Sequence, residues 1–118
     1  MDIHGIQEEL KEFAEAREWG RFHSPKNLAI ALAVEASELL EHFQWLTDDE
    51  SRTLADRPED HAAVVEELAD VMIYLIQLAG RLNVNLEQAV ADKMRKNAEK
   101  YPVDLARGNA VKYNRRAR

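Results

Sequence analysis

The sequence predicts an all-α fold, a four-helix bundle assembled as a dimer or a dimer of dimers. Apolar residues recur at intervals of three and four, no stretch alternates for long enough to make a strand, and glycine is scarce. Residues 68–79 are apolar on almost every side of a helix, which predicts a helix buried all round. A four-helix monomer with one solvated face cannot bury such a helix, so we expect part of it to lie in a subunit interface.

The first two helices are expected in the N-terminal half of the chain. An apolar stripe from Ile3 to Phe13 predicts a helix over residues 2–18. Ser24 followed by Pro25 is a helix-start signal, and the second helix should run from there to about Leu46. Its continuously apolar first half, residues 28–34, should be buried.

The last two helices follow a polar connection over residues 47–57, which we expect to be a loop with at most a short helical turn. Pro58 should open the third helix, which runs to about Leu82. Asn85 with Gln88 forms a capping-box pattern at the start of the fourth helix. That helix should end near Lys100, because Pro102 disfavours helix at the residue before it, and its inward residues should be Leu86, Ala89, Val90 and Met94.

The composition indicates one domain, residues 1–118, with a loose tail over about residues 103–118. There is no cysteine, which excludes disulfides and thiolate metal sites. The net charge of −6 argues against a nucleic-acid polymer as partner, although it allows a single nucleotide carried by a divalent metal. No apolar run reaches membrane-spanning length, so we expect a cytoplasmic protein without a membrane partner.

Two pairs of acidic residues indicate a possible functional site. Glu35 and Glu38 are three residues apart on the second helix, and Glu67 and Asp70 are three apart on the third. If the two helices are antiparallel, both pairs lie roughly 14 Å from the connecting loop and meet at one level. Four carboxylates in one place cannot all stay ionised without cations, and hard oxygen ligands suit Mg²⁺ or Mn²⁺.

Two other interpretations fit the acids less well. A di-iron bundle requires a Glu-x-x-His motif on each of two helices, and the histidines here do not have that spacing. The acids could also be ordinary surface charges of a Glu-rich protein. Two pairs at matching depth, both beside apolar runs, favour the metal site.

Aromatic and basic residues surround these acids in the expected fold. Trp45 is seven residues after Glu38 and Tyr74 is four after Asp70, so each shares a helical face with an acid. Together with Trp19 they could stack on a flat ligand, or they could be ordinary core. On the fourth helix, Lys93, Asn97 and Lys100 share one face. Spacing alone favours a solvated face for them, but a bound phosphate chain would make them a cationic clamp.

Several stretches together carry a family resemblance: Arg17-Glu18-Trp19, residues 22–28, the segment from Glu35 through Phe43-Gln44-Trp45, residues 66–74, and Lys93 to Pro102. Over about residues 8–113 the chain resembles the MazG-like all-α nucleotide pyrophosphohydrolases, in particular their dCTP pyrophosphatase branch. Either acid pair alone is unspecific, whereas the two pairs with Phe-Gln-Trp and Lys-x-x-x-Asn are specific.

The resemblance implies a Mg²⁺-dependent enzyme that splits a nucleoside triphosphate between its α- and β-phosphates, to cleanse the nucleotide pool of dCTP or of a modified nucleotide. It implies that sites are shared between subunits of a homodimer or homotetramer. It implies the following residue roles: metal ligands Glu35, Glu38, Glu67 and Asp70; base and sugar contacts Trp19, Trp45 and Tyr74; phosphate contacts Lys93, Asn97, Lys100 and Tyr101. For hydrolysis by a metal-activated water, we expect Glu38 or Glu41 to be the general base.

The chain departs from the family pattern at Leu10, where dCTP-specific members have a histidine, and this leaves the base preference open. It also has Val34 where members with the broader motif have a glutamate. Two rival functions remain. One is a pyrophosphohydrolase for another nucleotide, such as phosphoribosyl-ATP. The other is a non-enzymatic helical oligomer.

Overall fold

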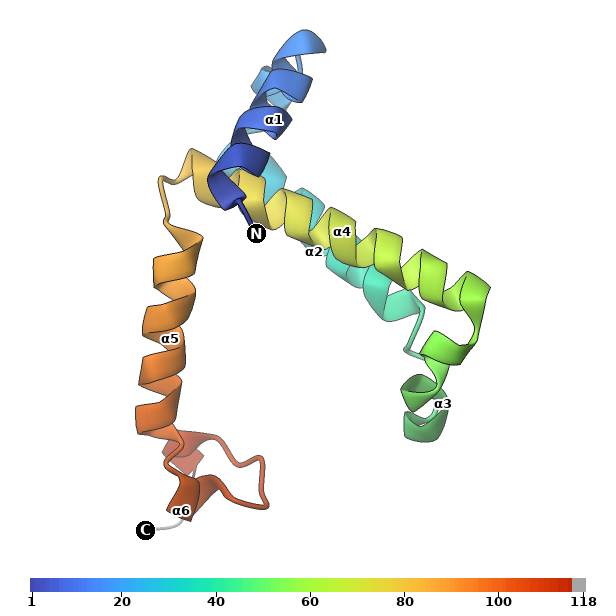
Figure 1. Ribbon diagram of the computed structural model, residues 1–118, viewed down its shortest axis with the longest axis vertical. Coiled ribbons are helices and arrows are strands. Elements are labelled where there is room, and N and C mark those ends of the chain that lie inside the picture. The colour runs from blue at the N-terminus through green and yellow to red at the C-terminus, as the bar shows by residue number, and fades with distance from the viewer. Residues whose placement is uncertain (116–118) are drawn as a thin grey trace. The chain divides into compact units, whose positions relative to one another are not determined.

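The computed structural model describes residues 1–115, and every regular element in that range is a helix (Figure 1). The chain divides into two compact units, Met1–Val84 and Asn85–Arg118, each described below by itself. The all-α prediction is therefore confirmed for the described residues. That residues 1–118 work as one domain stays a prediction.

Helix α1, Ile3–Ala16, begins at a side-chain cap and ends two residues before the predicted position. The Asp2 carboxylate accepts a hydrogen bond from the Gly5 amide at 2.9 Å, which satisfies one of the free N–H groups at the helix start. After Ala16 the chain turns through Glu18, whose φ of 54° lies in the left-handed region and ends the helical path. A single 3₁₀ turn, Gly20–Phe22, follows.

Helix α2, Pro25–Glu41, starts where the sequence predicts, with the Ser24 hydroxyl accepting from the Asn27 amide at 3.2 Å. It ends five residues earlier than predicted. From His42 onward the backbone amides bond three residues back as well as four, for instance Leu46 to the Phe43 carbonyl at 2.9 Å. The chain therefore leaves the α-helical path in a series of tight turns before Thr47.

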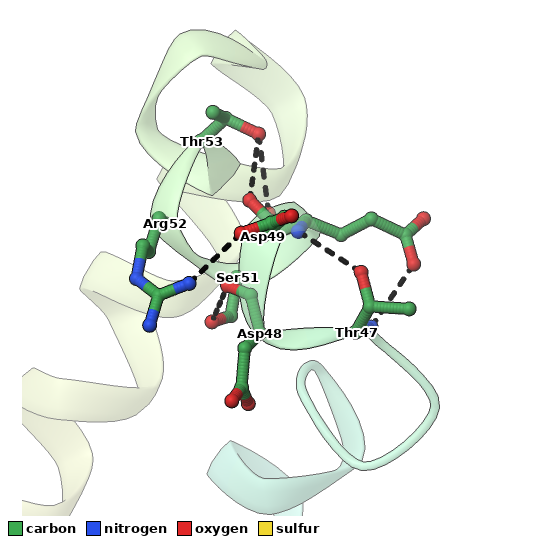
Figure 2. Close-up of polar contacts among 7 residues, drawn as sticks. Thr47, Asp48, Asp49, Ser51, Arg52 and Thr53 are labelled. Carbon is green, nitrogen blue, oxygen red and sulfur yellow. Dashed lines mark hydrogen bonds and ion pairs between the residues drawn. The ribbon is translucent and has the colours of Figure 1, made fainter.

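The polar connection forms a short helix, α3, Asp48–Arg52, held by a capping box (Figure 2). The Thr47 hydroxyl accepts from the Glu50 amide at 3.1 Å, and the Glu50 carboxylate accepts from the Thr47 amide at 3.0 Å. Arg52 pairs with Asp49 at 2.9 Å. A 3₁₀ turn, Leu54–Asp56, then buries Leu54 and leads into the next helix.

Helix α4, Pro58–Arg81, is the longest element and runs back along α2 in the opposite direction (Figure 1). Helix α1 packs against its C-terminal half, where the Gln7 side-chain amide donates to the Ile76 carbonyl at 3.1 Å. The core between these helices is small, and its buried apolar residues are Ala14, Leu28, Leu54, Val64, Ile76 and Ala79.

The outer faces of α2 and α4 are apolar but exposed. Ile30 and Val34 on α2 are 53% and 50% exposed, and Leu68 on α4 is 52% exposed. In the single chain, residues 28–34 are therefore only partly buried, whereas residues 71–79 are buried or half-buried. Within residues 1–84, the side chains of Ile30, Val34 and Leu68 are left without a covering element. The expected burial of the remaining apolar surface in a subunit interface stays a prediction.

The second unit contains α5, Leu86–Lys100, which starts and stops close to the predicted positions. Asn85 caps it by accepting from the Gln88 amide at 3.0 Å, but the Gln88 side chain donates to Asp92, so only half of the expected capping box forms. Val90 and Met94 are 54% and 66% exposed, and Ala89 is exposed too, which contradicts their predicted inward position. No residue of α5 is buried, so this unit has no core of its own for them to enter.

The expected loose tail contains a four-residue helix, α6, Val103–Ala106, and a 3₁₀ turn, Tyr113–Arg115. The Tyr113 amide donates to the Tyr101 hydroxyl at 3.4 Å, and the two rings meet edge to face. Residues 116–118, the end of the expected tail, lie outside the described residues. In the described part of the chain, no helix combines the length and apolarity required to cross a bilayer.

The core of the first unit predicts a specific pattern of stability loss. Ile76 is 1% exposed, so Ile76→Ala should lower the free energy of unfolding by about 2–5 kcal/mol through lost burial and a cavity. Arg52→Ala removes only an exposed ion pair and should cost less than about 1 kcal/mol. Urea unfolding at one protein concentration measures both, and equal small losses would contradict this account of the core.

Candidate functional site

Three carboxylates converge where α2 packs on α4. Glu35, Glu38 and Glu67 each offer one oxygen to a group in which all three atoms lie within 4.8 Å of one another. Each of the three residues is half-buried. The antiparallel course of the helices produces this meeting as the sequence predicts, and the early end of α2 does not disturb it because Glu38 lies within the helix.

The electrostatics of this cluster are unfavourable for the protein alone. The pKa of Glu35 is raised to about 7, first by burial of the carboxyl, then by the adjacent Glu38 and Glu67 side chains and the negative charge of Asp70. One oxygen each of Glu35 and Glu67, Oε2 in both, is buried without a hydrogen-bond partner. Unpaired buried acceptors cost free energy, and a bound cation would satisfy these two oxygens.

A hard divalent cation fits these donors. Mg²⁺ is bound by one or two carboxylates with water and phosphate oxygens completing its shell, and the cluster offers three carboxylates with two free oxygens. Asp70 is not among the three converging residues, but its charge acts on Glu35, so it lies near the cluster. That these four acids are metal ligands stays a prediction.

The two tryptophans predicted to contact a base have different surroundings in the structure. Trp19 lies beside α1, with its ring edge to face against Phe13 at 5.7 Å and against His23 at 6.4 Å. Trp45 is 86% exposed. Because α2 ends at Glu41, the helical spacing that put Trp45 on the face of Glu38 does not apply.

Two further predicted residues lie on the acid-bearing helices. Tyr74 is half-buried one turn after Asp70, within α4 as expected. Glu41, the alternative general base, is the last residue of α2 and is exposed.

The predicted phosphate-binding residues belong to the second unit. The pKa of Lys93 is lowered from its usual value, first by the positive charge of Lys100 and then by contact with that side chain, burial and Lys96. Lys93 and Lys100 are therefore close neighbours on α5, with Asn97 between them in the chain and exposed. The Lys100 ammonium lies 4.8 Å from the Tyr113 ring, and Tyr113 also contacts Tyr101.

Sequence reasoning missed a cavity of about 660 Å³ that lies between α1, the segment after it and the C-terminal end of α4. Its lining includes Leu10, His23, Leu28 and Gln77. One signal was available: apart from Tyr74, Gln77 is the only polar residue between Val71 and Ala79. A lone polar residue in an apolar helix marks a place where that helix faces something other than core.

Comparisons with known proteins agree on one family. The model of the MazG-like family matches residues 30–115. Proteins named dCTP pyrophosphatase 1 from Mus musculus and Homo sapiens are 52% and 49% identical to this chain over 102 residues, 86% of its length. The chain spans 60% of the length of these relatives.

A solved structure extends the likeness to the fold. The crystal structure of a pyrophosphatase from Archaeoglobus fulgidus superposes with a TM-score of 0.78 at 41% sequence identity, covering 86% of this chain and 94% of that one. The family match spans most of the sequence, and it includes all of α4 and the part of α2 that carries Glu35 and Glu38. The chain belongs to the MazG-like family.

Proposed function

We propose that this chain is a Mg²⁺-dependent nucleoside triphosphate pyrophosphohydrolase. It splits dCTP or a modified deoxynucleoside triphosphate into the monophosphate and pyrophosphate, and so cleanses the nucleotide pool. The observation that carries the proposal is the cluster of Glu35, Glu38 and Glu67 with two buried oxygens that lack partners. The names of relatives about half identical to this chain support the reaction and the substrate.

The acids have distinct tasks in this reaction. Glu35, Glu38, Glu67 and Asp70 hold the cation. When bound, Mg²⁺ neutralises the charge of the triphosphate and acidifies the water that attacks the α-phosphorus. Glu38 or Glu41 accepts the proton that this water loses, since both carboxylates belong to the last two turns of α2.

Residues outside the acid cluster bind the nucleotide in this proposal. Lys93 and Lys100 are held close enough for one to depress the pKa of the other, and a phosphate chain would relieve that repulsion. Asn97 and Tyr101 contact the phosphates beside them. Trp19 and Tyr74 contact the base and sugar. Trp45 follows the opposite end of α2 from Trp19, so in this proposal it reaches the nucleotide from a partner subunit.

The enzyme acts as a homodimer or homotetramer in this proposal. The exposed large apolar side chains of α2 and α4 are Ile30, Val34, Leu40, Val65 and Leu68. Each is about half exposed, and a second copy of the chain would remove this surface from water.

The activity itself gives the first test. With Mg²⁺, pyrophosphate should be released from at least one nucleotide in a panel of deoxy- and ribonucleoside triphosphates and phosphoribosyl-ATP, with dCTP or a modified form preferred. EDTA should abolish the release. Glu38→Gln should lower kcat/KM at least about 100-fold, while Glu59→Gln, an exposed acid in the first turn of α4, should not. Release from no nucleotide in metal-replete buffer would favour the non-enzymatic oligomer.

Metal binding can be checked without turnover. Mg²⁺ should raise the Tm of the wild-type protein, and Glu35→Gln should remove most of that increase. In EDTA the same variant should be more stable than wild type by roughly 3–6 °C, about 1 kcal/mol, because it removes a buried charge from among like charges. Glu59→Gln serves as the control. An unchanged response to Mg²⁺ in Glu35→Gln would exclude Glu35 as a ligand.

The apolar outer face gives a third test. Ile30→Asp should shift the molecular mass measured by light scattering toward that of the monomer, because a charge in an apolar interface loses its hydration. Lys26→Asp, one turn earlier on α2 and also exposed, should leave the mass unchanged. Equal oligomer masses for both variants would place the interface elsewhere.

A further inference from the structure

A line of polar side chains connects the acid cluster to the cavity along one face of α4. At 100° per residue, its members fall within an arc of roughly 80°, and in chain order they are Glu67, Asp70, Tyr74, Gln77 and Arg81. The first two belong to the acidic end, and the last two line the cavity. The acidic end and the cavity therefore lie along the same face of α4.

The distance between the acid cluster and the cavity matches the length of a nucleotide. Gln77 comes seven residues after Asp70 on α4, and Leu28 comes seven residues before Glu35 on α2, so on both helices the cavity begins roughly 10 Å from the acids. This is the scale of the distance between an α-phosphate and its base. Both seven-residue intervals are close to two full turns, so each cavity residue shares the face of its acid.

The lining of the cavity suits an uncharged group. Its carboxylates, Glu8 and Glu15, are balanced by the cations Lys11 and Arg81. Apolar side chains, including Leu10, Ala14 and Leu28, supply much of the remaining wall. A volume of about 660 Å³ falls within the roughly 300–1,000 Å³ of small-molecule pockets. A nucleoside matches this environment, whereas a phosphate chain would require a net positive lining.

Two glutamines lie in the cavity wall, and they differ in their hydrogen bonding. Gln7 donates to the Ile76 carbonyl, so its side chain is engaged in joining α1 to α4. Gln77 is half-buried and makes no side-chain hydrogen bond within residues 1–115. A carboxamide offers a donor and an acceptor side by side, which matches the hydrogen-bonding edge of a nucleobase.

We propose that this cavity holds the nucleoside of the substrate and that Gln77 is a specificity-determining residue which hydrogen-bonds the base. The inference rests on the proposed pyrophosphohydrolase function and adds to it the place of the base and the residue that selects it. A polar group positioned to pair with a substrate discriminates against analogues because a mismatched base leaves the amide unpaired.

The experiment compares kcat/KM for dCTP, dTTP, dATP and dGTP in wild type and in Gln77→Met, which preserves the side-chain length and removes the hydrogen bonds. For the preferred nucleotide kcat/KM should fall at least tenfold, and for the others less than threefold, so the preference collapses. Gln88→Met, on the exposed surface of α5, is the matched control and should retain the wild-type ranking.

A second variant tests the hydrogen-bonding pattern. Gln77→Glu can only accept when ionised, so the ranking should move away from cytosine, whose ring nitrogen is also an acceptor, toward bases with a ring N–H. The Tm increase with Mg²⁺ should be the same in all Gln77 variants, because the acid cluster is intact, whereas general damage to the fold would reduce it.

The outcomes separate the two proposals. An active wild type whose base ranking is unchanged in both Gln77→Met and Gln77→Glu would overturn the role of Gln77 and leave the pyrophosphohydrolase function standing. A wild type that releases pyrophosphate from no nucleotide would overturn the function, and the inference with it.

Discussion

The repulsion among carboxylates held between α2 and α4 is the constraint on which the rest of the structure depends. Helix packing brings Glu35, Glu38 and Glu67 within 4.8 Å, and burial raises the pKa of Glu35 to about 7. Such an arrangement costs free energy in the protein alone, and a bound cation would offset that cost. The contact between the two long helices thus includes a destabilising cluster of carboxylates near its middle. Destabilising clusters of this kind are typical of binding sites.

The helix pair that carries this site has little core of its own. Few apolar side chains are buried in the first unit, and none is buried on α5. A pair of helices with apolar residues on its outer faces is unfavourable as a monomer, because those apolar side chains remain in contact with water. Assembly into the proposed oligomer would remove this apolar surface from water.

The sequence predictions failed where the path of the chain departs from a regular helix. Trp45 was placed beside Glu38 by helical spacing, but α2 ends at Glu41 and the intervening turns leave Trp45 86% exposed. Likewise, Gln88 has the right spacing for a capping box, but its side chain bonds Asp92, a competing partner one turn ahead. Spacing arguments hold only while the backbone geometry that they assume continues.

By itself the sequence determined the helical class, the starts of α2, α4 and α5, and the two acid pairs, because caps, prolines and apolar periodicity act locally. It also contained the family motif. Only the tertiary structure decided that three of the acids meet, that Asp70 lies just outside that group, and that a cavity opens beside Gln77. These features depend on the register and rotation of one helix against another, which arise from packing between residues far apart in the chain and are not encoded in any local pattern.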